Sequence, residues 1–199
     1  MHRGRNLRIA VSPLRRIKEL CHSYNLELNE TFEKTQLVIS VYQEIVWGSL
    51  KNGDPGVSGS LEKGYQAAVS YLYSFPSSVD KSELQTVLLN LFQSEWFKGL
   101  INQALNGISA YARNGDEYAE ILNKRFFSEH SLRDYEVYLE MRKTKSTYYR
   151  LRKEAILFLG VRLWGVILPE LLKILPGSNA PKRAYMLMVA ENRELVSTK

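Results

Sequence analysis

Hydrophobic residues recur along this chain at the three- and four-residue spacing of helices, and the alternating pattern of strands is rare. A helix is predicted over 12–25, where Ser12-Pro13 forms a capping pair and the apolar stripe is Leu14, Ile17, Cys21 and Tyr24. A second, longer helix is predicted over 29–50, with a stripe of Phe32, Ile39, Tyr42, Ile45, Val46 and Leu50. The N-terminal quarter of the chain is therefore expected to be helical.

Breaks rich in glycine, proline and small polar residues separate the later helices. The segment 51–60 holds four glycine or proline residues and is predicted to be a loop. Further helices are predicted over 61–73, from the capping box of Asp80 and Glu83 to residue 92, over 94–113 and over 116–127. Asn114-Gly115 is the expected stop between the last two helices.

Two helices in the C-terminal half are separated only by a short basic turn. Ser131 and Asp134 are expected to open a helix that runs to Met141, and a second helix is predicted over 145–160. The remaining segments are an apolar stretch to residue 175, a break at 176–181 and an amphipathic stretch at 182–195. The whole pattern predicts an all-α fold with the spacing of a helix-turn-helix near its C-terminal end.

Charge is distributed unevenly along the 199 residues, which carry a formal net charge of +6. Residues 1–19 carry +5, residues 20–141 carry −7, residues 142–153 carry +6 and residues 154–199 carry +2. An acidic body with two basic segments is typical of a protein that binds a polyanion such as DNA.

Few residues in the sequence support catalysis or metal binding. The single cysteine, Cys21, and the three histidines lie far apart, so no metal site is expected. No phosphate-binding glycine loop, dinucleotide fingerprint or nucleophile elbow is present. Asp116 and Glu120 are expected on one helix face, where the helix dipole accounts for them without catalysis. We therefore expect a protein that is not an enzyme and binds no cofactor.

The predicted helix 145–160 has two different faces. At about 100° per residue, Leu151, Ala155 and Leu159 share a side with Tyr148, and the opposite side is basic and aromatic. The second helix of a helix-turn-helix enters the major groove with its N-terminal residues at the base edges. The residues expected to contact DNA are Arg142, Lys143, Lys145, Ser146, Thr147, Tyr149, Arg150 and Lys153.

Three segments carry a resemblance to a known family: 118–127 (YAEILNKRFF), 138–141 (YLEM) and 145–155 (KSTYYRLRKEA). Together they resemble the ArpU-type phage and prophage transcriptional regulators, whose C-terminal half is similar to the promoter-binding helix-turn-helix of sigma factors. The shared pattern is a helix ending in arginine and aromatics, a second helix, and then Ser-x-Tyr-Tyr before an alanine. Arg152 occupies a position that is usually aliphatic in that pattern.

The chain is expected to have three parts. They are a helical N-terminal region at 1–112, a sigma-region-4-like helix-turn-helix domain at 113–165 and a C-terminal helical extension at 166–199. The expected function is sequence-specific binding of double-stranded DNA to regulate transcription, which the resemblance implies for phage or prophage late genes. The alternative is a sigma-like adaptor or antiterminator that docks on RNA polymerase and contacts DNA only within that complex.

Location and assembly follow from the same patterns. Charged residues and a proline interrupt 155–175, and no export signal is apparent, so a cytoplasmic protein without a membrane span is expected. A homodimer is expected, because one helix-turn-helix makes few base contacts. The apolar stretch 158–175 either contributes the dimer interface or packs on the N-terminal helices. The N-terminal arginines form either a DNA-contacting arm or an unbound tail: Arg3, Arg5, Arg8, Arg15 and Arg16.

Overall fold

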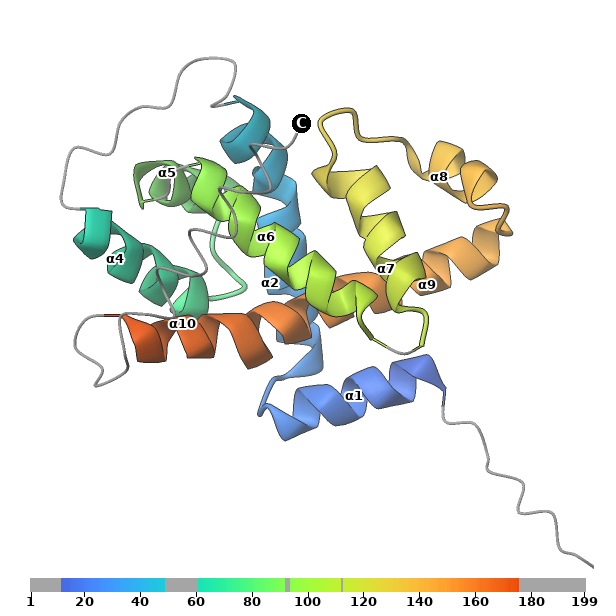
Figure 1. Cartoon of the computed structure of the whole chain (residues 1–199), viewed down its shortest axis with the longest axis horizontal. Helices are drawn as coiled ribbons and strands as arrows, with labels where there is room; N and C mark the ends of the chain where they lie inside the picture. The colour runs from blue at the N-terminus through green and yellow to red at the C-terminus, as the bar shows by residue number, and fades with distance from the viewer. Residues whose placement is uncertain (1–11, 49–60, 92–93, 112, 176–199) are drawn as a thin grey trace, which may run out of the picture.

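Helices account for all the regular secondary structure in the computed structural model of the chain (Figure 1), which describes residues 12–48, 61–91, 94–111 and 113–175. These ranges contain no strand, which confirms the expected all-α class. The predicted loop 51–60 and the two segments predicted beyond residue 175 lie outside the described residues.

The N-terminal helices begin at residues suited to capping. Helix α1 (Pro13–Ser23) starts after Ser12, whose Oγ accepts a hydrogen bond from the third residue of the helix. Helix α2 (Leu28–Gln43) starts after Glu27, whose carboxylate accepts a backbone hydrogen bond in the same way. The π-helical segment η1 (Glu44–Gly48) extends α2. Both predicted helices are confirmed within the described residues.

The middle of the chain contains α4 (Leu61–Ser74), α5 (Lys81–Leu91), α6 (Ser94–Ser109), α7 (Gly115–Leu122) and the π-helical segment η2 (Asn123–Phe127). The prediction was wrong at one junction, because α6 ends at Ser109 rather than at residue 113, and Gly115 begins α7 instead of ending α6. Asn114 has a left-handed backbone, with φ of 61°, which turns the chain back on itself. A Cβ at Gly115 would overlap the carbonyl oxygen of Ile108, so the close approach of α6 and α7 requires glycine there.

Helix α8 (Asp134–Glu140) begins three residues after the predicted cap. Its N-cap is Arg133, whose N–H donates to the Glu136 carboxylate at 2.6 Å, so Ser131 does not cap it. Asp134, expected to complete the cap with Ser131, is instead the first helical residue and pairs with arginines, as described below.

The last described helix is the longest in the structure. Helix α9 (Lys145–Gly160) has the predicted bounds, but it continues without a break through the π-helical segment η3 (Val161–Ile167) into α10 (Leu168–Ile174). The expected domain boundary at 165–166 lies inside this helix. Helix α9 packs mainly on α2 and α7 and has only a small contact with α8, while α10 packs on α4 (Figure 1).

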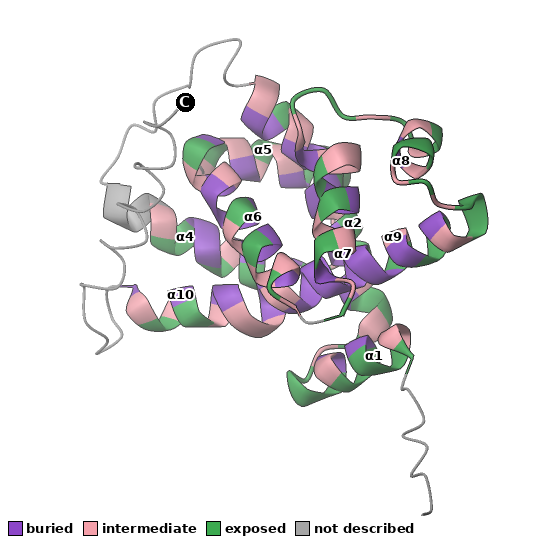
Figure 2. Cartoon of the chain, turned by 45° about the vertical axis from the view of Figure 1, so that its right-hand side comes forward, coloured by how far each residue is buried: buried purple, intermediate pink, exposed green. Residues whose placement is uncertain are grey.

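The apolar stretch that was considered for a dimer interface is buried inside the chain. Phe158, Trp164 and Leu168 are nearly inaccessible to solvent, and Trp164 Nε1 donates a hydrogen bond to the Leu72 carbonyl at 3.0 Å. This stretch therefore packs on the N-terminal helices, the second of the two arrangements considered for it. One cluster of buried side chains extends from Ile17 on α1 to Leu175 and joins the two sides of the expected boundary at 112–113 (Figure 2).

Lys145–Ile174 is the one helix in the described ranges that is long and apolar enough to cross a membrane by length and composition. Of its most apolar window, 67% is buried against the rest of the chain. One such helix is weak evidence for a membrane span, because the core helix of a soluble protein has the same length and composition.

Candidate nucleic-acid interface

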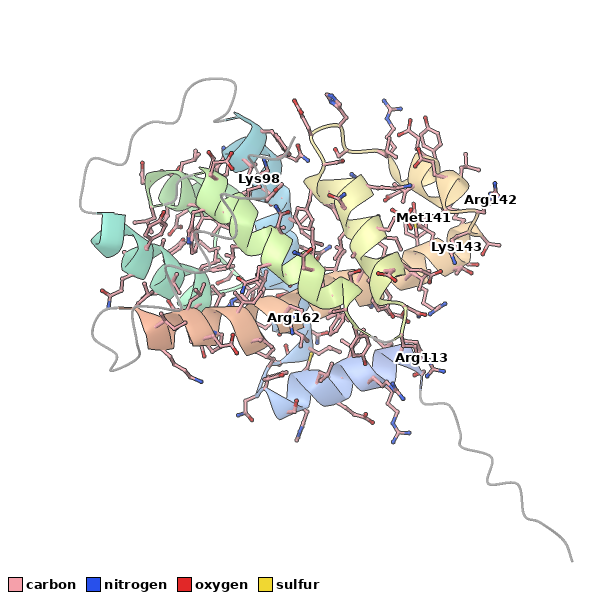
Figure 3. All side chains as sticks on the ribbon, viewed as in Figure 1. Lys98, Arg113, Met141, Arg142, Lys143 and Arg162 are labelled. Carbon is pink, nitrogen blue, oxygen red and sulfur yellow. The ribbon has the colours of Figure 1, made fainter. Side chains whose placement is uncertain are left out.

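The turn between α8 and α9 has a defined hydrogen-bonding pattern. Arg142 has a left-handed backbone, with φ of 51°, and the Lys143 N–H donates to the Tyr138 carbonyl at 2.9 Å, which is the geometry of a Schellman-type helix end. Thr144 then caps α9, because its Oγ1 accepts from the Thr147 N–H at 3.3 Å. Figure 3 shows Arg142 and Lys143 at the end of the molecule where α8 meets α9.

The first turns of α9 have the orientation that the sequence predicted. The side that packs into the protein consists of Tyr148, Leu151, Ala155 and Leu159, all fully or almost fully buried. The exposed side consists of Lys145, Ser146, Tyr149, Arg150 and Lys153. These residues span about 12 Å along the helix axis, and a helix of about 10–12 Å diameter fits the roughly 12 Å width of a DNA major groove. The predicted Thr147 is half-buried, and its hydroxyl accepts from Thr144 Oγ1 at 2.9 Å.

A buried carboxylate holds one of the exposed cations. Glu154 is 3% exposed and accepts hydrogen bonds from Tyr118 Oη at 2.8 Å and from Arg150 Nη1 at 3.0 and 3.2 Å. Burial, together with the hydrogen bond to Glu154, raises the pKa of the Tyr118 phenol, so this group stays a donor. Sequence analysis missed this contact, although the four-residue spacing of Arg150 and Glu154 was a visible signal.

The other cations predicted to contact DNA differ in whether another side chain already binds them. Lys143 is paired with Glu117 on α7. Lys153 Nζ lies 5.8 Å from the centroid of the Phe32 ring on α2. Within the described part of the chain, Arg142, Lys145 and Lys153 form no ion pair. No carboxylate therefore neutralises these three cations in the described part of the chain.

A second carboxylate joins three helical segments. Asp134 on α8 accepts from Arg125 Nε on η2 at 2.9 Å, and it accepts from two α9 residues, Tyr148 Oη at 2.7 Å and Arg152 Nη1 at 2.6 Å. Burial alone would raise the pKa of Asp134, but the hydrogen bonds from Tyr148 and Arg152 and the two guanidinium charges lower it. We call these four residues the Asp134 cluster. It explains the arginine at position 152, because this carboxylate gives its charge a partner.

The N-terminal arginines are only partly described. Arg15 and Arg16 are exposed on α1, and Arg15 Nε pairs with Glu19 at 3.1 Å. Arg3, Arg5 and Arg8 lie outside the described residues. Among the described residues no group of three or more His, Cys, Asp or Glu side chains is arranged to hold a metal ion.

The sequence and the structure were compared with those of known proteins. No protein-family model matches the sequence, and neither a curated protein nor a solved structure matches it.

Proposed function

We propose that this protein is a sequence-specific regulator of transcription that binds double-stranded DNA through α8, its following turn and the first turns of α9. The observation that carries the proposal is the exposed face of α9, which bears basic and hydrogen-bonding side chains. This helix begins near one end of the molecule (Figure 1). In a helix-turn-helix, that part of the second helix enters the major groove.

The side chains have different roles in this proposal. Arg150 contacts a base, since a guanidinium can donate two parallel hydrogen bonds to guanine O6 and N7. Ser146 and Tyr149 contact base edges or phosphates with their hydroxyl groups, and Tyr149 also packs on a thymine methyl. Lys145, Lys153 and Arg142 neutralise phosphates, which adds affinity that decreases as salt increases.

The short segments that resemble ArpU-type regulators extend the proposal to a class of genes. They cover most of α7, all of η2, the end of α8 and the first part of α9, which bears the exposed face. We propose on this basis a cytoplasmic regulator of phage or prophage late genes that acts as a homodimer on two half-sites. No metal or cofactor has a role in this mechanism.

One observation favours the alternative of docking on RNA polymerase. Tyr135 and Leu139 lie one helical turn apart on α8 and, at 47% and 64%, are the two most exposed large hydrophobic side chains among the described residues. A protein partner would cover them. In that case the basic face of α9 contacts DNA only after the protein has docked on the polymerase.

Selection of binding sites from random duplex DNA by the purified full chain tests the leading function. An enriched motif, bound by the protein alone with an affinity that decreases with salt, is the expected result. Enrichment only in the presence of RNA polymerase supports the alternative, and a Leu139→Asp variant should then lose binding. No enrichment under either condition contradicts both proposals.

A further inference from the structure

A pocket of about 330 Å³ lies between α2 and α9, next to the Asp134 cluster. Six of its lining residues are polar or charged: Gln36, Ser40, Gln43, Arg125, Ser131 and Arg152. Two of the six are cations, and no carboxylate is among the described residues that line it. The pocket therefore presents positive charge to whatever enters it.

The two guanidinium groups are held in place but keep spare donors. Asp134 takes one hydrogen bond from each, and an arginine has five N–H donors in a rigid plane. The Arg125 Cζ lies 5.0 Å from the centroid of the Phe126 ring, and the Arg152 Cζ lies 5.2 Å from that of Tyr149, so each guanidinium also rests on an aromatic ring. One carboxylate neutralises only one of the two positive charges.

The rest of the pocket suits an apolar body attached to an anion. Ile39, Phe126 and Ile156 complete the lining. Gln43 fixes one wall, because its Nε2 donates to the carbonyls of Phe126 and Ser128 at 2.8 and 2.9 Å. The pocket therefore combines two cations with a small apolar surface on rigid elements.

We propose that this pocket binds a small organic anion, a phosphate monoester of a compact apolar group. The anion would accept hydrogen bonds from the free donors of Arg125 and Arg152, since guanidinium groups match the geometry of such oxyanions. The apolar group would pack on Ile39 and Ile156. A volume of about 330 Å³ lies at the lower end of the range for ligand pockets, about 300–1,000 Å³. This inference does not depend on the proposed binding of DNA.

Calorimetric titration of the full chain with phenyl phosphate tests the proposal, with phenol as the uncharged analogue and inorganic phosphate as the anion alone. We expect saturable binding of phenyl phosphate, weaker binding of inorganic phosphate and no binding of phenol. No saturable binding of phenyl phosphate, or equal binding of phenol, overturns the proposal.

Two pairs of variants locate the site. Ser131→Asp places a carboxylate beside the two arginines and should weaken phenyl phosphate binding by about tenfold or more, while Ser131→Asn, of similar size but neutral, should not. Ser40→Trp should block the pocket, while Ser70→Trp, at an exposed position on α4, is the control. If the two variants of either pair bind phenyl phosphate with equal affinity, the pocket is not the binding site. A third result also overturns the proposal of a small-molecule site. If the wild-type chain does not bind phenyl phosphate and Ser131→Asp weakens only the binding of duplex DNA, the pocket accepts a DNA phosphate.

Discussion

The guanidinium of Arg150 is exposed on α9, yet its Nη1 is bound to the carboxylate of Glu154, which is buried one helical turn away. The side chain best suited to contact guanine is thus held in one direction before DNA binds. Its Nε and Nη2 are not used by this contact, so two nitrogen atoms with three N–H donors remain for a base. A residue held in this way loses less conformational entropy when it binds than a free arginine does.

Replacement of Arg150 therefore has two separable effects. Arg150→Ala should cost about 1–3 kcal/mol of operator binding and relax the preference at one base pair. It should also destabilise the fold, because Glu154 then keeps only its hydrogen bond from Tyr118. Arg150→Lys restores a cation for Glu154 but cannot form the two parallel hydrogen bonds, so it should recover stability and not specificity. Operator titrations and urea unfolding measure the two effects, and unchanged operator affinity in both variants contradicts the groove assignment.

Cations that contact only phosphate should behave differently. Lys153→Ala should weaken binding to all sequences alike and reduce the slope of log affinity against log salt by about one unit. Arg142→Gly should do the same, and it also replaces a left-handed arginine with the residue that tolerates this backbone best.

Lys173→Ala is the matched control, since Lys173 is exposed at the far end of the same long helix. Binding to operator and random duplex is measured over a series of salt concentrations. A slope that Lys153→Ala and Lys173→Ala leave equally unchanged contradicts a phosphate contact at Lys153.

Asp134 should contribute to the pH dependence of stability. The folded protein holds its pKa below the ordinary value of 3.8, so the unfolded chain binds this proton more readily than the folded protein. The stabilisation is present above pH 3.8 and is lost as the pH falls through the lower folded pKa. Asp134→Asn should cost about 1.5–3 kcal/mol near neutral pH, because two arginines lose a charged partner.

Unfolding free energies measured from neutral pH down to about pH 2 check that the stabilisation from Asp134 is lost as the pH falls. The difference between wild type and Asp134→Asn should be constant near neutrality and shrink in the acid range. A difference that grows as the pH falls would contradict the assignment.

The sequence predicted much of the site because it depends on local signals. The basic turn and the 3.6-residue period gave the start of α9 and its exposed face, and both are confirmed. The helix continues past the predicted end at residue 160. The Asp134 cluster was not predictable, because Asp134 can pair with Arg125 and Arg152 only after three segments have packed together. The hydrophobic period predicts which residues are buried, but it does not predict which part of the protein, or which partner, covers them. The apolar stretch after Gly160 therefore had two interpretations until its partners were known.

Packing around α9 gives a further test of its orientation. Ala155 is fully buried where α9 packs among its neighbours. Ala155→Glu buries a charge with no partner and should destabilise the protein by more than about 3 kcal/mol. Ala67→Glu, at an exposed position on α4, is the matched substitution and should have little effect. Thermal and urea unfolding distinguish them, and a wild-type melting temperature for Ala155→Glu would show that α9 is turned the other way.

The core position of Trp164 gives the last prediction. Its ring packs on Phe75 at 6.0 Å between centroids, and its Nε1 donates to the Leu72 carbonyl, so Trp164→Ala removes a large side chain and leaves an acceptor unpaired. It should cost about 3–5 kcal/mol of stability. Tyr73→Ala, where the side chain is 43% exposed, is the control and should cost much less.

The same variant separates a core role from a role in the expected homodimer. If Trp164 stabilises the fold of each chain, the loss in Trp164→Ala is the same at every protein concentration, and light scattering gives wild-type assembly below the melting temperature. A loss that disappears on dilution, with a change from dimer to monomer, would place Trp164 at an interface. Truncation after Gly160 cannot make this distinction, because it removes Trp164, Leu168 and Leu171 from the core and should unfold the chain.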